Sequence, residues 1–173
     1  MKETLSLQLL TETTWVDKNH LSSQFKKSTF HLRARCTLTD LDRLVPLLNE
    51  SISLNESLQH RVKAQALHWG DQDQIETFSK NPPDLILVAD CVYYEASIEP
   101  LVDTLASLSS FSRCPILLSY EIRDEFEEKR AVKEKFFELA RKSFCIKEFE
   151  TSDCHQDYAA DDIKVLRLDP IGD

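Results

Sequence analysis

The sequence predicts an α/β fold, a doubly wound and mostly parallel sheet that ends in an antiparallel hairpin at its C-terminal side. Three observations predict it. After residue 36, short apolar segments at strand spacing alternate with segments whose apolar residues recur every three or four positions. Residues 84–89 form a nearly continuous apolar run, which is typical of a strand buried on both faces of a parallel sheet. No helix separates the last two strand segments, which favours an antiparallel pair.

The first expected elements lie between residues 35 and 70. Residues 35–39 are β-branched and apolar and predict a short strand. One apolar stripe indicates the helix after it, with Asp40 or Asp42 as its cap and Pro46 in its first turn. Residues 62–69 alternate as a second strand and stop at Gly70. The stripe consists of Leu41, Leu44, Val45, Leu48 and Ile52.

Two further helices and four strands complete the alternation after a proline-containing loop at residues 81–83. Each helix is indicated by a single apolar stripe, and the second helix is long and rich in charge. The order of strands and helices implies right-handed crossovers between parallel strands. The expected ranges are 84–89, 98–108, 115–120, 123–142, 144–150 and 162–168.

The length and composition are those of one globular domain. The chain has 173 residues, of which 42% are hydrophobic and 29% charged, so it can bury a core. Its net charge of −9 argues against nucleic acid as a partner, because nucleic-acid binding needs clustered lysine and arginine. No stretch reaches the roughly 18–20 apolar residues of a membrane span, so no membrane partner is expected.

The cysteines and the N-terminus predict a cytoplasmic location, with the nucleus as a second one. The five cysteines are odd in number and form no close pair, which is typical of reduced thiols. The first ten residues lack the pattern of a signal peptide. Cys154 and His155 lie beside Asp153 and Asp157, but their spacing matches no zinc module, so no metal site is expected.

Polar and aromatic side chains follow four of the expected strands, where ligands bind in open α/β sheets. Asp40 follows the first strand and Trp69 lies at the end of the second. Residues 90–95 (DCVYYE) follow the third strand, and residues 120–123 (YEIR) the fourth. A carboxylate accepts hydrogen bonds from the paired hydroxyls of a ribose, and an indole suits an adenine face. An acid with two tyrosines suits a cation.

Each of these residues also has a purely structural explanation. A carboxylate after a strand often caps the next helix, so Asp90 could cap the helix that begins near Ser97. A tryptophan such as Trp69 is often part of the core. The convergence of four strand ends on one ligand favours a binding site over these separate explanations.

Three motifs and three shorter matches resemble one known family. The motifs are residues 38–41 (LTDL), 67–70 (LHWG) and 84–95 (DLILVADCVYYE), and the shorter matches are 97–101, 119–123 and 158–163. Together they resemble the seven-β-strand, methyltransferase-like protein-lysine methyltransferases, and most closely the members that methylate the chaperone ATPase valosin-containing protein. The resemblance covers residues 36–168. It implies a class I methyltransferase fold with S-adenosylmethionine as cofactor and a protein, expected to be a chaperone or ATPase, as substrate.

The resemblance implies cofactor contacts for four residues. Asp40 would hold the ribose hydroxyls, and Trp69 would border the adenine. Ala89 would line the methionine side of the cofactor, with Tyr94 close by.

Two residues, Asp90 and Tyr93, would shape the pocket of the target lysine as the catalytic residues, without a metal. A lysine attacks only as a neutral amine, and its ordinary pKa is about 10.4. An apolar, aromatic pocket lowers that pKa, and a carboxylate orients the amine.

The N-terminal segment departs from the family pattern. A first strand and a glycine-rich loop should precede Asp40, but the only glycines of the chain are Gly70 and Gly172. We therefore expect residues 1–35 to be a divergent segment and residues 36–170 to form a truncated methyltransferase domain without the first strand. The alternative function is a catalytically inactive, methyltransferase-like protein-binding module. A nucleotide- or flavin-binding protein is disfavoured because no glycine motif could cradle a phosphate.

Overall fold

The computed structural model describes residues 6–11, 34–55, 59–122, 126–150 and 160–172. Its strands are β1 (Ser6–Thr11), β2 (Arg35–Asp40), β3 (Val62–Ala66), β4 (Leu85–Ala89), β5 (Ile116–Glu121), β6 (Phe144–Glu148) and β7 (Ile163–Pro170). Its helices are the 3-10 turn η1 (Asp42–Leu44), α2 (Val45–Ser53), α3 (Gln72–Glu76), α4 (Glu95–Ser110) and α5 (Glu127–Ala140).

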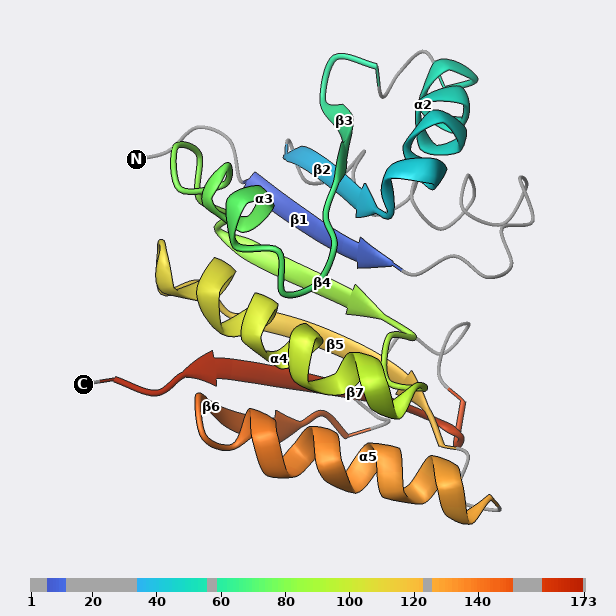
Figure 1. The fold of residues 1–173 in the computed structure, drawn as a ribbon, viewed down its shortest axis with the longest axis vertical. Helices are drawn as coiled ribbons and strands as arrows, with labels where there is room; N and C mark the ends of the chain where they lie inside the picture. The colour runs from blue at the N-terminus through green and yellow to red at the C-terminus, as the bar shows by residue number, and fades with distance from the viewer. Residues whose placement is uncertain (1–5, 12–33, 56–58, 123–125, 151–159, 173) are drawn as a thin grey trace.

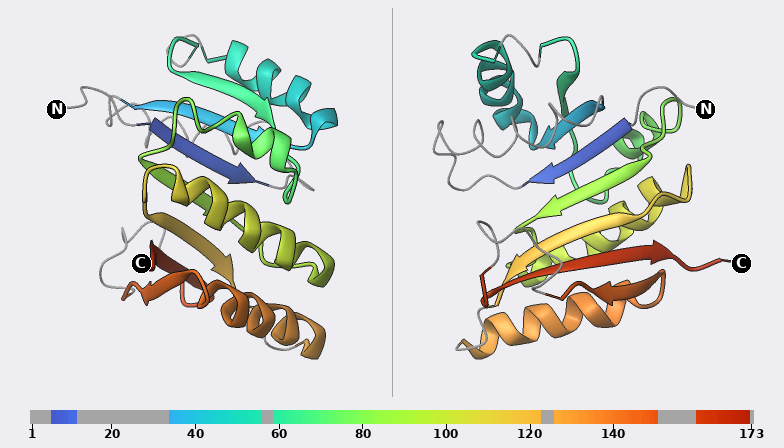
Figure 2. Two further views of the ribbon diagram at one scale, coloured as in Figure 1. Left: turned by 60° about the vertical axis from the view of Figure 1, so that its left-hand side comes forward. Right: turned by 180° about the vertical axis from the view of Figure 1, so that it is seen from behind.

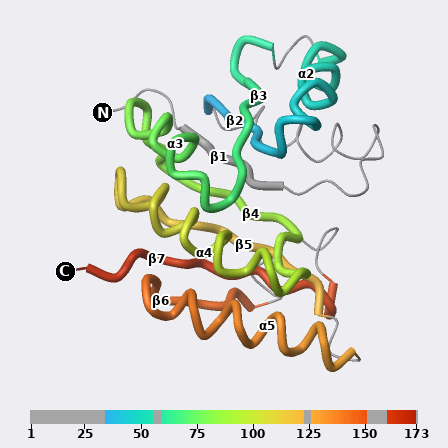
Figure 3. The backbone as a smooth tube through the Cα atoms, viewed as in Figure 1, coloured from blue at the N-terminus to red at the C-terminus, as the bar shows by residue number. Residues whose placement is uncertain are grey.

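The strands form one seven-stranded sheet in the order β3-β2-β1-β4-β5-β7-β6 (Figure 1). Strands β1 to β5 pair in parallel, whereas β7 pairs antiparallel with β5 on one side and β6 on the other. Figure 3 follows the chain from β6 back along β7, which inserts between β5 and β6. The predicted doubly wound sheet with its C-terminal antiparallel pair is therefore confirmed.

The centre of the sheet corrects the expected domain organisation. Strand β1 lies between β2 and β4, with Leu9 opposite Leu38 on one side and Leu87 on the other. The expectation that the domain lacks its first strand is therefore wrong, and the sheet includes part of the segment 1–35. The sequence of β1, SLQLLT, is short and contains a glutamine, so it lacks the continuous apolar run that marks a central parallel strand. The residues expected to carry a glycine-rich loop lie at 12–33, outside the described residues.

Two apolar clusters lie on opposite faces of the sheet. Helices α4 and α5 bury their stripes against the face to which Ile86 and Val88 of β4 point. Leu48 of α2 belongs to the cluster on the other face, against which the alternate residues Leu85 and Leu87 pack. Figure 2 shows α4 and α5 on one side of the strands in both views. This placement of helices on both faces leaves the carboxyl ends of β2, β3 and β4 at one edge of the sheet, where the site lies.

Most helix predictions are confirmed, with local differences. Pro46 lies in the first turn of α2, where its missing N–H costs no hydrogen bond. The expected aspartate caps are wrong, because Leu41 and Leu44 occupy the N-cap positions of η1 and α2 without side-chain hydrogen bonds. Helix α3 is too short for a periodic signal and was not predicted. Asp71 caps it by accepting a hydrogen bond from the Gln74 N–H at 3.0 Å.

The cysteines of the described residues are free thiols, of which Cys36, Cys91 and Cys114 are buried and Cys145 is exposed. Among these residues no group of three or more metal-ligating side chains could hold a metal ion, and no helix is long and apolar enough to cross a membrane. Cys154 and His155 lie outside the described residues.

Cys36 predicts a pH dependence of stability. Burial raises the pKa of its thiol from 9.0 to about 12, because the thiolate would lose its hydration inside the sheet. The unfolded chain therefore releases this proton at a lower pH than the folded chain, so stability should fall as the pH rises from 9 towards 12. We expect Cys36→Ala to flatten this part of a urea-denaturation pH profile, and Cys145→Ala to leave it unchanged. An identical slope in parent and Cys36→Ala would contradict the assignment.

Candidate functional site

A pocket of about 200 Å³ opens at the carboxyl ends of β2 and β3. Its lining comes from three parts of the chain: the end of β2, the turn after β3 and the first half of α4. The lining residues are Asp40, Leu41, Leu67, His68, Trp69, Ser97 and Pro100. This is the edge at which open α/β sheets bind ligands, so the pocket is the candidate site.

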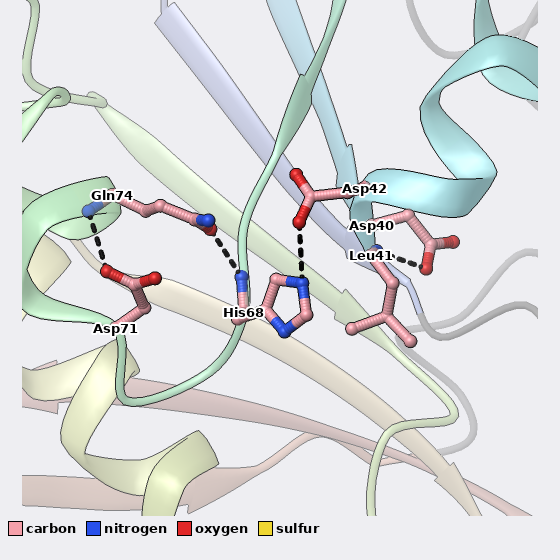
Figure 4. Close-up of polar contacts among 6 residues, drawn as sticks. All are labelled: Asp40, Leu41, Asp42, His68, Asp71 and Gln74. Carbon is pink, nitrogen blue, oxygen red and sulfur yellow. Dashed lines mark hydrogen bonds and ion pairs between the residues drawn. The ribbon is translucent and has the colours of Figure 1, made fainter.

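Asp40 is the buried acid of the pocket. It is the last residue of β2 and only 3% exposed. Its Oδ1 accepts a hydrogen bond from the Leu41 N–H at 2.8 Å (Figure 4), and its backbone oxygen accepts one from the Leu67 N–H at 2.9 Å. These bonds fix the carboxylate at the junction of two strand ends. Because this residue caps neither η1 nor α2 with its side chain, the cap explanation for Asp40 is wrong.

Trp69 also lines the pocket, in the turn that follows β3. The strand stops at Ala66, so the expected strand 62–69 is shorter than predicted. Gly70 has φ +86°, a left-handed conformation that a residue without a Cβ adopts freely, and the chain turns there. Trp69 is half-buried, lines the pocket and packs against the main apolar cluster. It therefore contributes to the core and to the pocket at once.

A chain of polar contacts holds the turn beside the pocket (Figure 4). The Gln74 side chain accepts a hydrogen bond from the His68 N–H at 2.7 Å, while Asp71 caps the helix that carries Gln74. The His68 Nε2 lies 2.9 Å from the Asp42 Oδ2, with the side chains 47% and 66% exposed. A contact this exposed to water contributes little to stability, but it links the loops after β2 and β3.

The turn after β4 carries the remaining predicted residues. Asp90 is exposed and has φ +52°, a left-handed conformation that is uncommon outside glycine, asparagine and aspartate. The Asp90 N–H donates to the Ser119 oxygen at 3.0 Å, which ties the turn to the end of β5. Such a backbone conformation persists only where neighbours hold it, and it is concentrated at functional sites. Tyr94 is the N-cap of α4, so the alternative that Asp90 caps this helix is wrong.

Helix α5 secures the same turn. The Lys129 Nζ donates to the Tyr93 oxygen at 2.9 Å and lies 5.4 Å from the centre of the Tyr94 ring. The two tyrosine rings are 4.5 Å apart, and Tyr93 is 9% exposed whereas Tyr94 is 56% exposed. Lys135 adds an ion pair with Glu95 at 3.3 Å. The aromatic pair thus already carries a lysine ammonium on its surface.

The structure brings together some of the predicted residues. Asp40 and Trp69 line one pocket. Ala89 and Asp90 are exposed at the end of β4, and Tyr93 and Tyr94 follow them into α4, which contributes Ser97 and Pro100 to the pocket wall. The predicted residues of this turn are therefore neighbours of the pocket in the chain, but they do not line it.

Sequence reasoning named no cofactor or substrate contact for five lining residues, although all five lie in motifs that resemble the family: Leu41, Leu67, His68, Ser97 and Pro100. Leu41 and His68 adjoin Asp40 and Trp69 in the chain, and Leu67 lies two residues before Trp69, so closeness to predicted residues was their signal. Ser97 and Pro100 come from a helix that the sequence does not place against the turn after β3.

A second cavity, of about 580 Å³, lies between α5 and the strands β5, β7 and β6. Its lining includes Lys133 and Phe137 of α5, the C-cap residue Arg141, and Tyr120 from the predicted strand-end residues 120–123. It is the larger of the two cavities, but it lies away from the carboxyl ends of β2 and β3.

Comparison with known proteins agrees with the motifs. A family model described as lysine methyltransferase matches residues 25–143. Protein-lysine N-methyltransferase EFM6 of Saccharomyces cerevisiae is 33% identical over 129 residues, 71% of this chain and 50% of that protein. Protein N-lysine methyltransferase METTL21A of Danio rerio is 32% identical over 119 residues, 68% of this chain and 50% of that protein. The chain spans about half the length of the curated relatives it matches.

Solved structures share the fold. The DszA carbon methyltransferase superposes with a TM-score of 0.63 at 12% identity, covering 97% of this chain and 47% of that one. The methyltransferase domain of bacterial CtHen1 superposes with a TM-score of 0.59 at 12% identity, covering 96% and 90%. The predicted class I methyltransferase fold is confirmed.

Proposed function

Because the chain belongs to the lysine methyltransferase family, we propose that it transfers a methyl group from S-adenosylmethionine to a lysine side chain of another protein. The observation that carries the proposal is the meeting of Asp40 and Trp69 in one pocket. Both residues belong to the motifs by which the sequence resembles the family, and they come from the ends of adjacent strands.

The residues of the pocket fit the nucleoside part of the cofactor. The buried Asp40 carboxylate lies in the pocket lining, and a carboxylate suits ribose hydroxyls because it accepts hydrogen bonds. The Trp69 indole and Pro100 provide an apolar surface for an adenine. When bound, the cofactor supplies a methyl group on a positively charged sulfur. Ala89 and Tyr94, which lie beyond this pocket, are proposed to border the methionine side.

The turn after β4 is proposed to receive the target lysine. Tyr94 presents an exposed aromatic ring beside the buried Tyr93, and such a surface attracts an ammonium and, once water is excluded, lowers the pKa of a lysine amine. Asp90 is proposed to orient the amine as it loses its proton. Lys129 holds this surface in place from α5 through the Tyr93 carbonyl.

A protein is the proposed substrate, since the relatives that the chain matches are named for protein lysine methylation. The motif resemblance supports a finer proposal, that the substrate is a chaperone or an ATPase such as valosin-containing protein. Methyl incorporation into purified valosin-containing protein tests it, and labelling of a different protein from a whole-cell extract would redirect it.

One observation favours the alternative of a non-catalytic binding module. No glycine precedes Gly70, so residues 12–33 contain no position at which the backbone could approach a cofactor without a Cβ. A thermal-shift titration with S-adenosylhomocysteine separates the two functions, because a ligand that binds only the folded state must raise the melting temperature. A melting temperature that stays constant up to millimolar ligand would favour the binding module.

The missing glycines also predict a weak cofactor affinity. We expect calorimetric titration with S-adenosylhomocysteine to give a higher Kd for this chain than for full-length EFM6. The physical reason is that, without glycine, a Cβ at every position hinders the close approach of backbone N–H donors to a ligand that a glycine-rich loop allows. Equal Kd values for the two proteins would show that the N-terminal segment rebuilds these contacts without glycine.

A further inference from the structure

Thr104 is a buried polar residue of α4 whose hydroxyl both donates and accepts a hydrogen bond. It is 0% exposed. Its Oγ1 donates to the Pro100 oxygen at 2.8 Å and accepts a hydrogen bond from the Gly70 N–H at 2.7 Å, across 34 residues of sequence. The hydroxyl hydrogen of Thr104 points to the Pro100 oxygen, so the lone pairs of Oγ1 accept the Gly70 N–H.

The Gly70–Thr104 bond connects two parts of the candidate pocket lining, while the Thr104–Pro100 bond lies within α4. Pro100 is a lining residue on α4, and Gly70 immediately follows the lining residue Trp69. A Cβ built on Gly70 would lie 3.4 Å from the Pro100 Cβ, so the turn lies directly against the helix. The Thr104 hydroxyl therefore gives the turn that contains Trp69 and Gly70 a direct polar anchor on α4.

The other anchors of this turn reach different elements. The Leu67 N–H bonds to Asp40, and the His68 N–H bonds to Gln74 of α3. Of the hydrogen bonds described for residues 67–71, the Gly70–Thr104 bond is the one that reaches α4. Removing it would leave the C-terminal side of Trp69 without this polar link to α4, the helix that also lines the pocket.

We infer that Thr104 is a positioning residue that, through Gly70, holds the Trp69 indole in the orientation that the adenine site requires. This inference rests on the proposed function for the identity of the ligand. The coupling of Thr104 to Trp69 itself rests only on the two hydrogen bonds and the burial of the hydroxyl.

The first test needs no cofactor. In the full chain carrying Trp15→Phe, Trp69 is the only indole, so its emission reports its surroundings directly. Thr104→Val keeps the shape of the side chain and removes the hydroxyl, and we expect it to shift the emission maximum to longer wavelength. Thr104→Ser keeps the hydroxyl and should retain the parent spectrum. Should Thr104→Val fail to fold, Thr104→Ala provides the same comparison in a smaller side chain.

The second test is a double-mutant cycle with S-adenosylhomocysteine as the titrated ligand. Thr104→Val should weaken binding on the order of 5- to 10-fold, as expected for the loss of one hydrogen bond. Combined with Trp69→Ala, it should weaken binding no further than Trp69→Ala alone. Equal losses in both backgrounds would overturn the inference, since Thr104 would then act independently of the indole.

The two tests also separate this inference from the proposed function. If the parent chain does not bind S-adenosylhomocysteine, the cofactor proposal fails while the emission comparison still decides the role of Thr104. Identical emission spectra for parent and Thr104→Val would reject the positioning role whatever the chain binds.

Discussion

Asp90→Asn is expected to lower the rate of methyl transfer per folded molecule by about 10²-fold, the cost of losing precise orientation of a reacting group. The melting temperature should change little. Asparagine adopts the left-handed conformation as readily as aspartate, so the backbone at φ +52° is preserved. The residue lies outside the N-cap of α4, so no capping energy is lost either.

The assay for Asp90 is incorporation of labelled methyl from S-adenosylmethionine into purified valosin-containing protein and into a whole-cell protein extract. Tyr93→Phe belongs in the same series, because it removes only the hydroxyl and leaves the ring against Tyr94. Asp103→Asn is the matched control, since it makes the same change at an exposed position of α4. Full activity of Asp90→Asn would remove this carboxylate from the mechanism. A parent chain that binds cofactor and methylates no protein lysine would overturn the substrate proposal.

Asp40→Asn is expected to raise the Kd for S-adenosylhomocysteine by roughly 10- to 100-fold, because hydrogen bonds to a charged group contribute about 1.5–3 kcal/mol each. The asparagine side chain still offers an oxygen to the Leu41 N–H, so the folded state keeps its local hydrogen bond. Calorimetric titration measures the affinity, and a urea-denaturation curve measures the stability of the same variant.

The control for Asp40 is Asp73→Asn, which removes an exposed charge from the first turn of α3 without touching the pocket lining. Both variants change the net charge equally, so a general electrostatic effect would appear in both. An unchanged Kd for Asp40→Asn would exclude the acid from ribose binding. A large loss of stability without a separate loss of affinity would make Asp40 a structural residue at the strand junction.

Much of the fold could be read from local patterns. The apolar run of β4 and the stripes of α4 and α5 predict their elements because burial imposes a period that the sequence records. The five-residue helix α3 is too short to show such a period. Strand β1 was not predicted either. Its six residues lack the continuous apolar run that marks a central parallel strand, so the sequence does not indicate its place between β2 and β4.

The candidate site, like the fold, could be predicted from the sequence only in part. Asp40, Trp69 and Asp90 could be proposed from the sequence because each follows or ends an expected strand, and parallel strands place their carboxyl ends at one edge. The sequence could not predict how these three residues are arranged relative to one another. The sheet and helix packing set Asp40 and Trp69 around one pocket and left Asp90 in a separate turn.

The sequence by itself determined the α/β class, the family motifs and the chemistry available at three strand ends. Only the tertiary structure decided that β1 lies at the centre of the sheet, that α4 supplies Ser97 and Pro100 to the pocket, and that Thr104 bonds Gly70. The physical reason is the distance along the chain over which each feature is determined. Periodicity and caps are properties of neighbouring residues, whereas strand order and the Thr104–Gly70 hydrogen bond depend on how distant elements pack around a shared core.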